Sequence, residues 1–129
     1  MKRSLAVGTG VAAVLVMGAA GALAWDYWYS PEARALRVVR GNLIDPDSAK
    51  FSEVVHHPET GGTCGLVNAK NRMGGYTGDK LFLVTAKGDF DLAPEEPDDW
   101  KPLDDKIKQM EIRVAWLEKA LAQCPQPDK

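Results

Sequence analysis

The chain contains few of the residues that build metal or thiol chemistry. Its 129 residues include only two cysteines and two histidines, too few cysteines for a four-thiolate zinc site. The phosphate-binding pattern Gly-x-x-x-x-Gly-Lys-Ser/Thr is absent, and so is the spacing of an EF-hand. We therefore expect no metal site, no cofactor and no catalytic cluster.

The chain also lacks a strong excess of either charge. Its 18 acidic and 16 basic residues give a net charge of −2, which excludes a strongly basic nucleic-acid binder. Its hydrophobic content of 45% excludes a highly charged disordered chain. A chain of this length forms one domain, with an N-terminal segment in front of it.

The N-terminal segment predicts the compartment. Lys2 and Arg3 precede an uncharged run from Leu5 to Trp25, and more aromatic residues follow within residues 25–29. Such a run is long enough to form a membrane-spanning helix. The two basic residues before it favour a cytoplasmic N-terminus. The alternative is a signal peptide cleaved after Ala24. We expect residues 1–29 to be a signal anchor inserted through 5–24, with residues 30–129 forming a periplasmic domain at the inner membrane. Cleavage would instead release that domain as a secreted or periplasmic protein.

The exported part predicts an α+β fold. Ser30-Pro31-Glu32 has the chemistry of a helix start, and Asp45-Pro46-Asp47-Ser48 repeats it for a short turn. Alternating or continuous apolar residues predict a three- or four-stranded antiparallel sheet. Its expected strands are residues 51–55, 64–70, 81–86 and 89–92, with His56 and His57 in a loop.

The C-terminal part combines an acidic linker with a long amphipathic helix. Residues 93–102, the acidic linker, contain three prolines among acids, which predicts a solvated connection; a weak calcium site is the alternative. Residues 103–124 predict a helix, because apolar residues recur at spacings of four and three on one side. These residues, called the apolar stripe below, are Leu103, Ile107, Met110, Val114, Leu117, Leu121 and Cys124. We expect the stripe to pack on the sheet in a monomer, with a coiled-coil dimer as the rival interpretation.

The two cysteines predict a disulfide. Cys124 lies on the apolar stripe and Cys64 begins an expected strand, so both should meet between helix and sheet. In an exported protein, two thiols that meet are usually oxidised. The alternative interpretation makes Cys64 a nucleophile activated by His56 or His57.

Three segments carry a resemblance. They are Asp45-Pro46-Asp47-Ser48-Ala49-Lys50-Phe51, Cys64-Gly65-Leu66-Val67-Asn68-Ala69-Lys70-Asn71 and Gly74-Gly75-Tyr76-Thr77-Gly78. This pattern resembles a group of small bacterial proteins, exported or membrane-anchored and in part phage-associated, for which no activity is known. The resemblance covers about residues 35–85. It implies a location and a shared fold, and no mechanism.

The glycine-rich segment from Asn71 to Gly78 is the first candidate binding site. Its glycines can shape a hairpin whose tyrosine packs at the edge of the core. The functional interpretation is that a rigid loop presents binding groups. The candidate residues are Asn68, Lys70, Asn71, Arg72 and Tyr76.

These patterns favour a non-enzymatic interaction module. We expect it to be tethered to the membrane and to bind a protein or envelope component through the Gly74–Gly78 loop. One alternative is a structural oligomer formed through the C-terminal helix, and another is an enzyme that depends on Cys64.

Overall fold

The structure is a computed structural model that describes residue 21, residues 24–25 and residues 28–126. The predicted anchor, residues 5–24, lies outside the described residues except at Gly21 and Ala24. Among the described helices, none combines the length and apolar character needed to cross a membrane.

The first described helix, α2 (Pro31–Gly41), begins as the sequence predicts. The Ser30 hydroxyl accepts a hydrogen bond from the Ala33 backbone N–H at 3.1 Å, and Pro31 occupies the first helical turn. This cap satisfies one of the backbone donors that a helix start leaves free. A 3₁₀ turn, η1 (Pro46–Ser48), then leads the chain into the sheet.

The sheet has four antiparallel strands in chain order. They are β1 (Lys50–His57), β2 (Gly62–Asn68), β3 (Lys80–Val84) and β4 (Phe90–Leu92). The α+β class and the antiparallel sheet are thus confirmed, with four strands. The prediction of a loop at His56 and His57 was wrong, because both residues extend β1 by pairing with Thr63 and Gly62.

The two faces of the sheet bury different groups. Phe82 and Val84 of β3 and Val67 of β2 pack under Ala35 and Val39 of α2, which forms the main core. Leu83 points to the opposite face, as the alternation of side chains along a strand requires. β3 therefore buries apolar residues on both faces, as expected of a strand inside the sheet.

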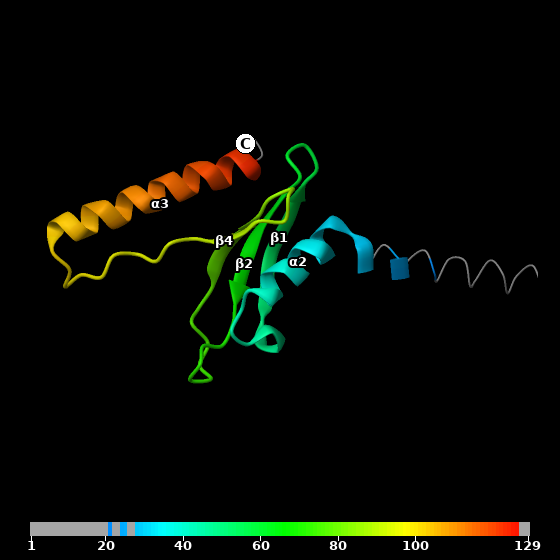
Figure 1. Cartoon of the computed structure of the whole chain (residues 1–129), viewed down its shortest axis with the longest axis horizontal. Coiled ribbons are helices and arrows are strands. Elements are labelled where there is room, and N and C mark those ends of the chain that lie inside the picture. The colour runs from blue at the N-terminus through cyan, green and yellow to red at the C-terminus, as the bar shows by residue number, and fades with distance from the viewer. Residues whose placement is uncertain (1–20, 22–23, 26–27, 127–129) are drawn as a thin grey trace, which may run out of the picture.

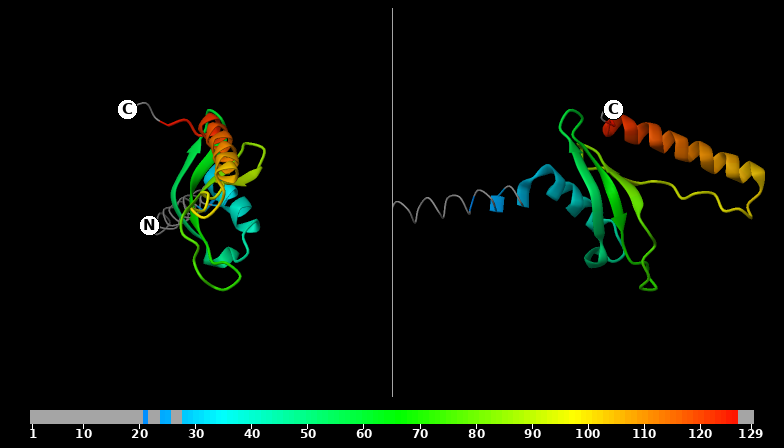
Figure 2. Two further views of the ribbon diagram at one scale, coloured as in Figure 1. Left: turned by 90° about the vertical axis from the view of Figure 1, so that its left-hand side faces the viewer. Right: turned by 180° about the vertical axis from the view of Figure 1, so that it is seen from behind.

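The C-terminal helix α3 (Leu103–Gln123) meets the sheet in its C-terminal half, where Trp116 packs on Leu83 and Lys119 pairs with Asp91 of β4. From the sheet, the acidic linker runs outward beside α3, and the helix then returns toward the sheet (Figure 1). There Cys124, just after the helix, is bonded to Cys64 of β2. Viewed from behind, α2 and α3 extend on opposite sides of the sheet (Figure 2).

The prediction that the apolar stripe packs on the sheet was wrong. Only its last residue, Cys124, is buried; the other six are between 39% and 70% exposed. The buried side of α3 is set by Trp116, which is 7% exposed and packs with Leu83 and Cys124. Trp116 lies beside the stripe and not on it.

The linker explains this orientation. Ten extended residues span about 33 Å, and a helix of 21 residues is about 32 Å long. The linker and α3 therefore match in length, so the helix starts far from the sheet and returns to it. Side chains on one side of α3 bind the linker: Arg113 pairs with Glu96 at 2.9 Å, and Lys106 donates to the Asp99 carbonyl at 2.7 Å.

Candidate functional site

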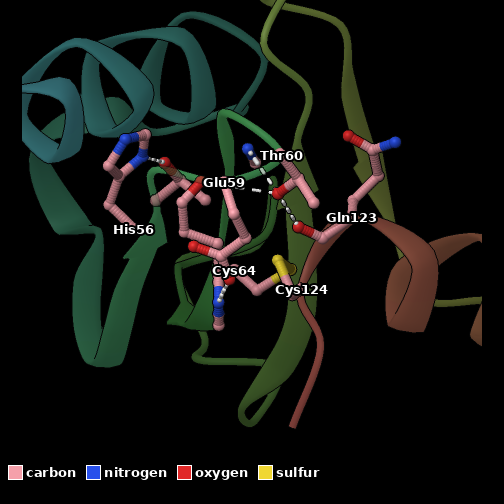
Figure 3. Close-up of a disulfide and its surroundings, with 9 residues drawn as sticks. His56, Glu59, Thr60, Cys64, Gln123 and Cys124 are labelled. Carbon is pink, nitrogen blue, oxygen red and sulfur yellow. Dashed lines mark hydrogen bonds and ion pairs between the residues drawn. A yellow bond between two sulfur atoms is a disulfide. The ribbon is translucent and has the colours of Figure 1, made fainter. Parts of the chain in front are cut away.

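The end of α3 is fastened to the sheet by three neighbouring groups. Cys64 and Cys124 form a disulfide with their Cα atoms 6.4 Å apart. The Thr60 hydroxyl, in the turn between β1 and β2, donates to the Gln123 carbonyl and accepts from the Gly62 N–H (Figure 3). Gly62 leaves no room for a side chain, because a Cβ there would lie 2.6 Å from the Gln123 carbonyl oxygen. We call these five residues the clamp.

The clamp confirms the predicted disulfide. The bridge closes a sequence separation of 60, for which the chain-entropy model gives a stabilisation of about 4 kcal/mol. A disulfide-bonded sulfur holds no thiolate, so Cys64 is not a nucleophile in this state. The nearby histidines have other partners: His56 Nδ1 lies 2.9 Å from the Thr63 hydroxyl, and His57 Nδ1 lies 3.2 Å from Glu59.

Beyond the clamp, the apolar stripe is the largest exposed apolar feature of α3. Ile107, Met110 and Val114 line a shallow hollow of about 520 Å³ together with Ala115 and two glutamates. Large apolar side chains gathered on one face are the usual mark of a contact surface. The stripe therefore has the composition of a buried helix seam, while the chain's own described residues leave it open.

The charges beside the stripe are sorted by sign. One flank carries Asp104, Glu111 and Glu118, and the other carries Lys106 and Arg113. The two bases also contact the acidic linker, as described above. The three acids make no ion pair with any residue that the structure describes.

The loop between β2 and β3 is the second exposed surface. Asn71 holds the loop together, since its side-chain oxygen accepts from the Met73 N–H at 2.9 Å and the Gly75 N–H at 3.2 Å. Asn68 similarly accepts from the Gly78 N–H at 3.2 Å. These two candidate residues thus have structural roles, and their oxygens already have partners.

Tyr76 lies across a pair of lysines. Its hydroxyl donates to the Ser48 carbonyl at 3.2 Å, and the ammonium groups of Lys50 and Lys70 lie 4.4 Å and 5.6 Å from the ring centroid. Cation–π contacts of this kind fix the ring on the surface. The structure therefore brings Lys70 and Tyr76 together, and it leaves Arg72 exposed near the tip of the loop.

The acidic residues of the linker are exposed to solvent, as the sequence predicts, and two of them form ion pairs at the surface. Glu95 pairs with Lys80 of β3 at 2.6 Å, and Asp98 pairs with Lys101 at 3.4 Å. The Lys80 ammonium, by its hydrogen bond and its charge, lowers the pKa of the Glu95 carboxyl from its ordinary value of 4.5. Within the part of the chain that the structure describes, no group of three or more metal-binding side chains gathers.

The comparisons with known proteins give no further constraint. No family model, no curated protein and no solved structure matches the chain. Its function is therefore argued from its own residues.

The sequence predicted the apolar stripe correctly, but the prediction that the stripe packs on the sheet was wrong. The sequence feature that could have predicted the orientation of α3 is the pair of basic residues on one flank of the stripe. Lys106 and Arg113 stand seven residues apart, on the side that meets the acidic residues preceding the helix. That pairing of opposite charges indicates which side of the helix the linker covers.

Proposed function

We propose that this protein is a non-enzymatic interaction module that works outside the cytosol, at the membrane, and that its contact surface is the apolar stripe of α3. The observation that carries the proposal is the exposure of six successive stripe residues on a helix whose C-terminal end is fastened to the sheet. Burying apolar surface contributes roughly 25 cal/mol per Å², so a partner that covers the stripe gains substantial free energy.

The clamp supports this function. A flexible helix would lose conformational entropy when it bound, and this loss would weaken the complex. In this chain the disulfide and the linker contacts already hold α3 in place. The helix is therefore preorganised for binding.

The location rests on the N-terminal sequence and on the disulfide. The uncharged run of residues 5–24 favours insertion into the inner membrane, with the folded domain in the periplasm. A disulfide persists in such an oxidising compartment and is rare in the cytosol.

A photoreactive amino acid placed in the stripe tests this function in cells. We expect the full chain with the probe at Val114 to form a discrete protein adduct on illumination, because the partner covers that position. Lys108, exposed on another side of the same helix, is the matched control position. Absence of an adduct at Val114, or an equal adduct at Lys108, would refute the proposed contact surface.

The loop between β2 and β3 is a second candidate surface of the same module. Met73 at its tip is 94% exposed, and Arg72 and the lysine-flanked ring of Tyr76 lie beside it. Aromatic and arginine side chains are common at binding hot spots. The same photoreactive probe at Met73 tests the loop independently of α3.

A further inference from the structure

We propose that the partner of the apolar stripe is a second copy of this chain, and that the two α3 helices form a parallel, in-register coiled coil. The inference rests on the function proposed above and names the occupant of its contact surface. It is carried by three features of α3: the repeat, the residue types at the seam, and the order of the flanking charges.

The stripe follows the heptad repeat of a two-stranded coil. Its spacings place Ile107, Val114 and Leu121 at the first apolar position of each heptad, called a. The other apolar position, called d, holds Leu103, Met110, Leu117 and Cys124. β-branched residues at a together with leucine at d favour two parallel strands. Ile107, Val114 and Leu117 follow that rule.

The flanking charges select the parallel orientation. The positions beside d, called e, hold Asp104, Glu111 and Glu118, and the positions beside a, called g, include Lys106 and Arg113. In a parallel pair, each g residue faces the e residue five positions later on the other helix. Lys106 then faces Glu111 of the second copy, and Arg113 faces Glu118.

The same charges oppose the antiparallel orientation. An antiparallel pair places e beside e and g beside g, which would bring acids against acids and bases against bases. Like charges at close range repel, and such contacts suppress the wrong arrangement. The charge order therefore distinguishes two arrangements that the apolar stripe alone would permit.

The fold leaves room for this pair. Cys124, at the last d position, is bonded to Cys64 of the sheet, so the free seam runs from Leu103 to Leu121. The other contacts of α3 with this cluster, Trp116 and Ala120, lie outside the a and d positions. Lys106 binds the linker at the Asp99 carbonyl and Arg113 binds it at Glu96, and a lysine has three donors and an arginine five. Each base can therefore keep its linker contact and also bind an acid of the second helix.

The parallel orientation also agrees with the proposed membrane location. Because α3 ends at the sheet through the clamp (Figure 1), a parallel pair places both sheets at the same end of the coil. Two chains inserted in one membrane could then pair without either domain turning over.

Engineered cysteines in the full chain, in detergent micelles, test the register. We expect Leu103→Cys, at the first d position, to give an interchain disulfide on mild oxidation, because equal d positions meet in a parallel pair. The control is Asp105→Cys, two residues away on the outer side of the helix, which should stay uncrosslinked. The native Cys64–Cys124 bridge is checked in both variants by intact mass.

Charge reversal tests the pairing itself. We expect the double variant Glu111→Lys with Glu118→Lys to weaken the dimer on the order of tenfold or more, because all four interchain pairs become repulsive. Mixing it with Lys106→Glu combined with Arg113→Glu should restore pairing, now between unlike copies. The acidic pair has no intrachain ion-pair partner among the described residues, so its reversal leaves the fold of one copy intact.

Three outcomes would overturn the inference. They are equal crosslinking at positions 103 and 105, a dimer unaffected by the reversal, and a wild-type chain that stays monomeric with no crosslink at position 103. If the last result came with a Val114 photo-adduct to a different protein, the dimer would be refuted while the proposed function stood. If Val114 gave no adduct at all, both would fail.

Discussion

At the scale of single residues, the role of a side chain depends on its position and not on its type alone. Gly62 admits the end of α3 because any Cβ would strike the Gln123 backbone, whereas a Cβ at Gly41 would meet no atom within 4 Å. Asn68 and Asn71, expected as binding donors, instead hold the loop with their side-chain oxygens. Residue type alone predicted where polar groups gather, but the direction of each oxygen depends on a turn whose geometry the sequence does not specify.

The ion pair of Lys80 and Glu95 gives a prediction at this scale. Because the Lys80 ammonium lowers the pKa of Glu95, the variant Lys80→Met should return that pKa to near its ordinary value. A carboxyl NMR titration of Glu95 measures this, with Lys108→Met as the control that leaves it unchanged.

The sign for stability follows from the same shift. A carboxyl whose folded-state pKa is lowered stabilises the fold above its unfolded value of 4.5, and this contribution is lost as the pH falls through the folded-state pKa. The contribution is small because Glu95 is 79% exposed. An unchanged titration of Glu95 in Lys80→Met would show that the pair does not form in solution.

At the scale of elements, α3 shows what a periodic pattern can and cannot predict. The period of the apolar residues identified the helix, its bounds and its seam, because these depend on local geometry. What the apolar stripe packs against depends on the linker, because the extended linker places the start of α3 far from the sheet. Trp116, one residue from Leu117, then packs on the sheet in place of the stripe.

Adjacent substitutions in α3 test this arrangement. We expect Trp116→Ala to lower the free energy of unfolding by about 3 kcal/mol or more, because it leaves a cavity against Leu83. Leu117→Ala, at a side chain that is 39% exposed, should lower it by less than about 1 kcal/mol. Urea denaturation measures both at a concentration where the chain is monomeric, since dimerisation adds its own stability.

The order of the two effects should reverse when dimer formation is measured in place of stability. Leu117→Ala removes a seam residue and weakens pairing, while Trp116→Ala acts through the fold. If Leu117→Ala proved the more destabilising change in the monomer, the stripe would have to be buried against its own chain.

At the scale of the whole molecule, most of the architecture followed from the sequence. The helix start at Ser30, the antiparallel sheet and the disulfide were all predicted, because capping, alternation and oxidised cysteine pairs are local or pairwise rules. The layers were predicted as well, since α2 covers one face of the sheet. The C-terminal helix was predicted to pack on the sheet through its apolar stripe, whereas the structure buries the face opposite α2 around Leu83 and leaves Val55 and Leu81 about half exposed.

The described part of the molecule is thus a sheet with two opposite extensions. α2 leads toward the N-terminal segment, and α3 with its linker projects from the other side (Figure 2). In the proposed setting, the first extension connects the domain to the membrane and the second presents the stripe. The clamp joins the second extension to the sheet. The disulfide therefore both stabilises the fold and holds α3 where its apolar stripe can bind a partner.

The most direct test is a methyl NOE measurement on the full chain in micelles, using a mixture of isotope-labelled and unlabelled copies. The account predicts contacts between the Trp116 indole and Leu83 within one chain. It also predicts contacts of the Val114 methyls that occur only between copies. Contacts of the Val114 methyls with the sheet of their own chain would contradict it.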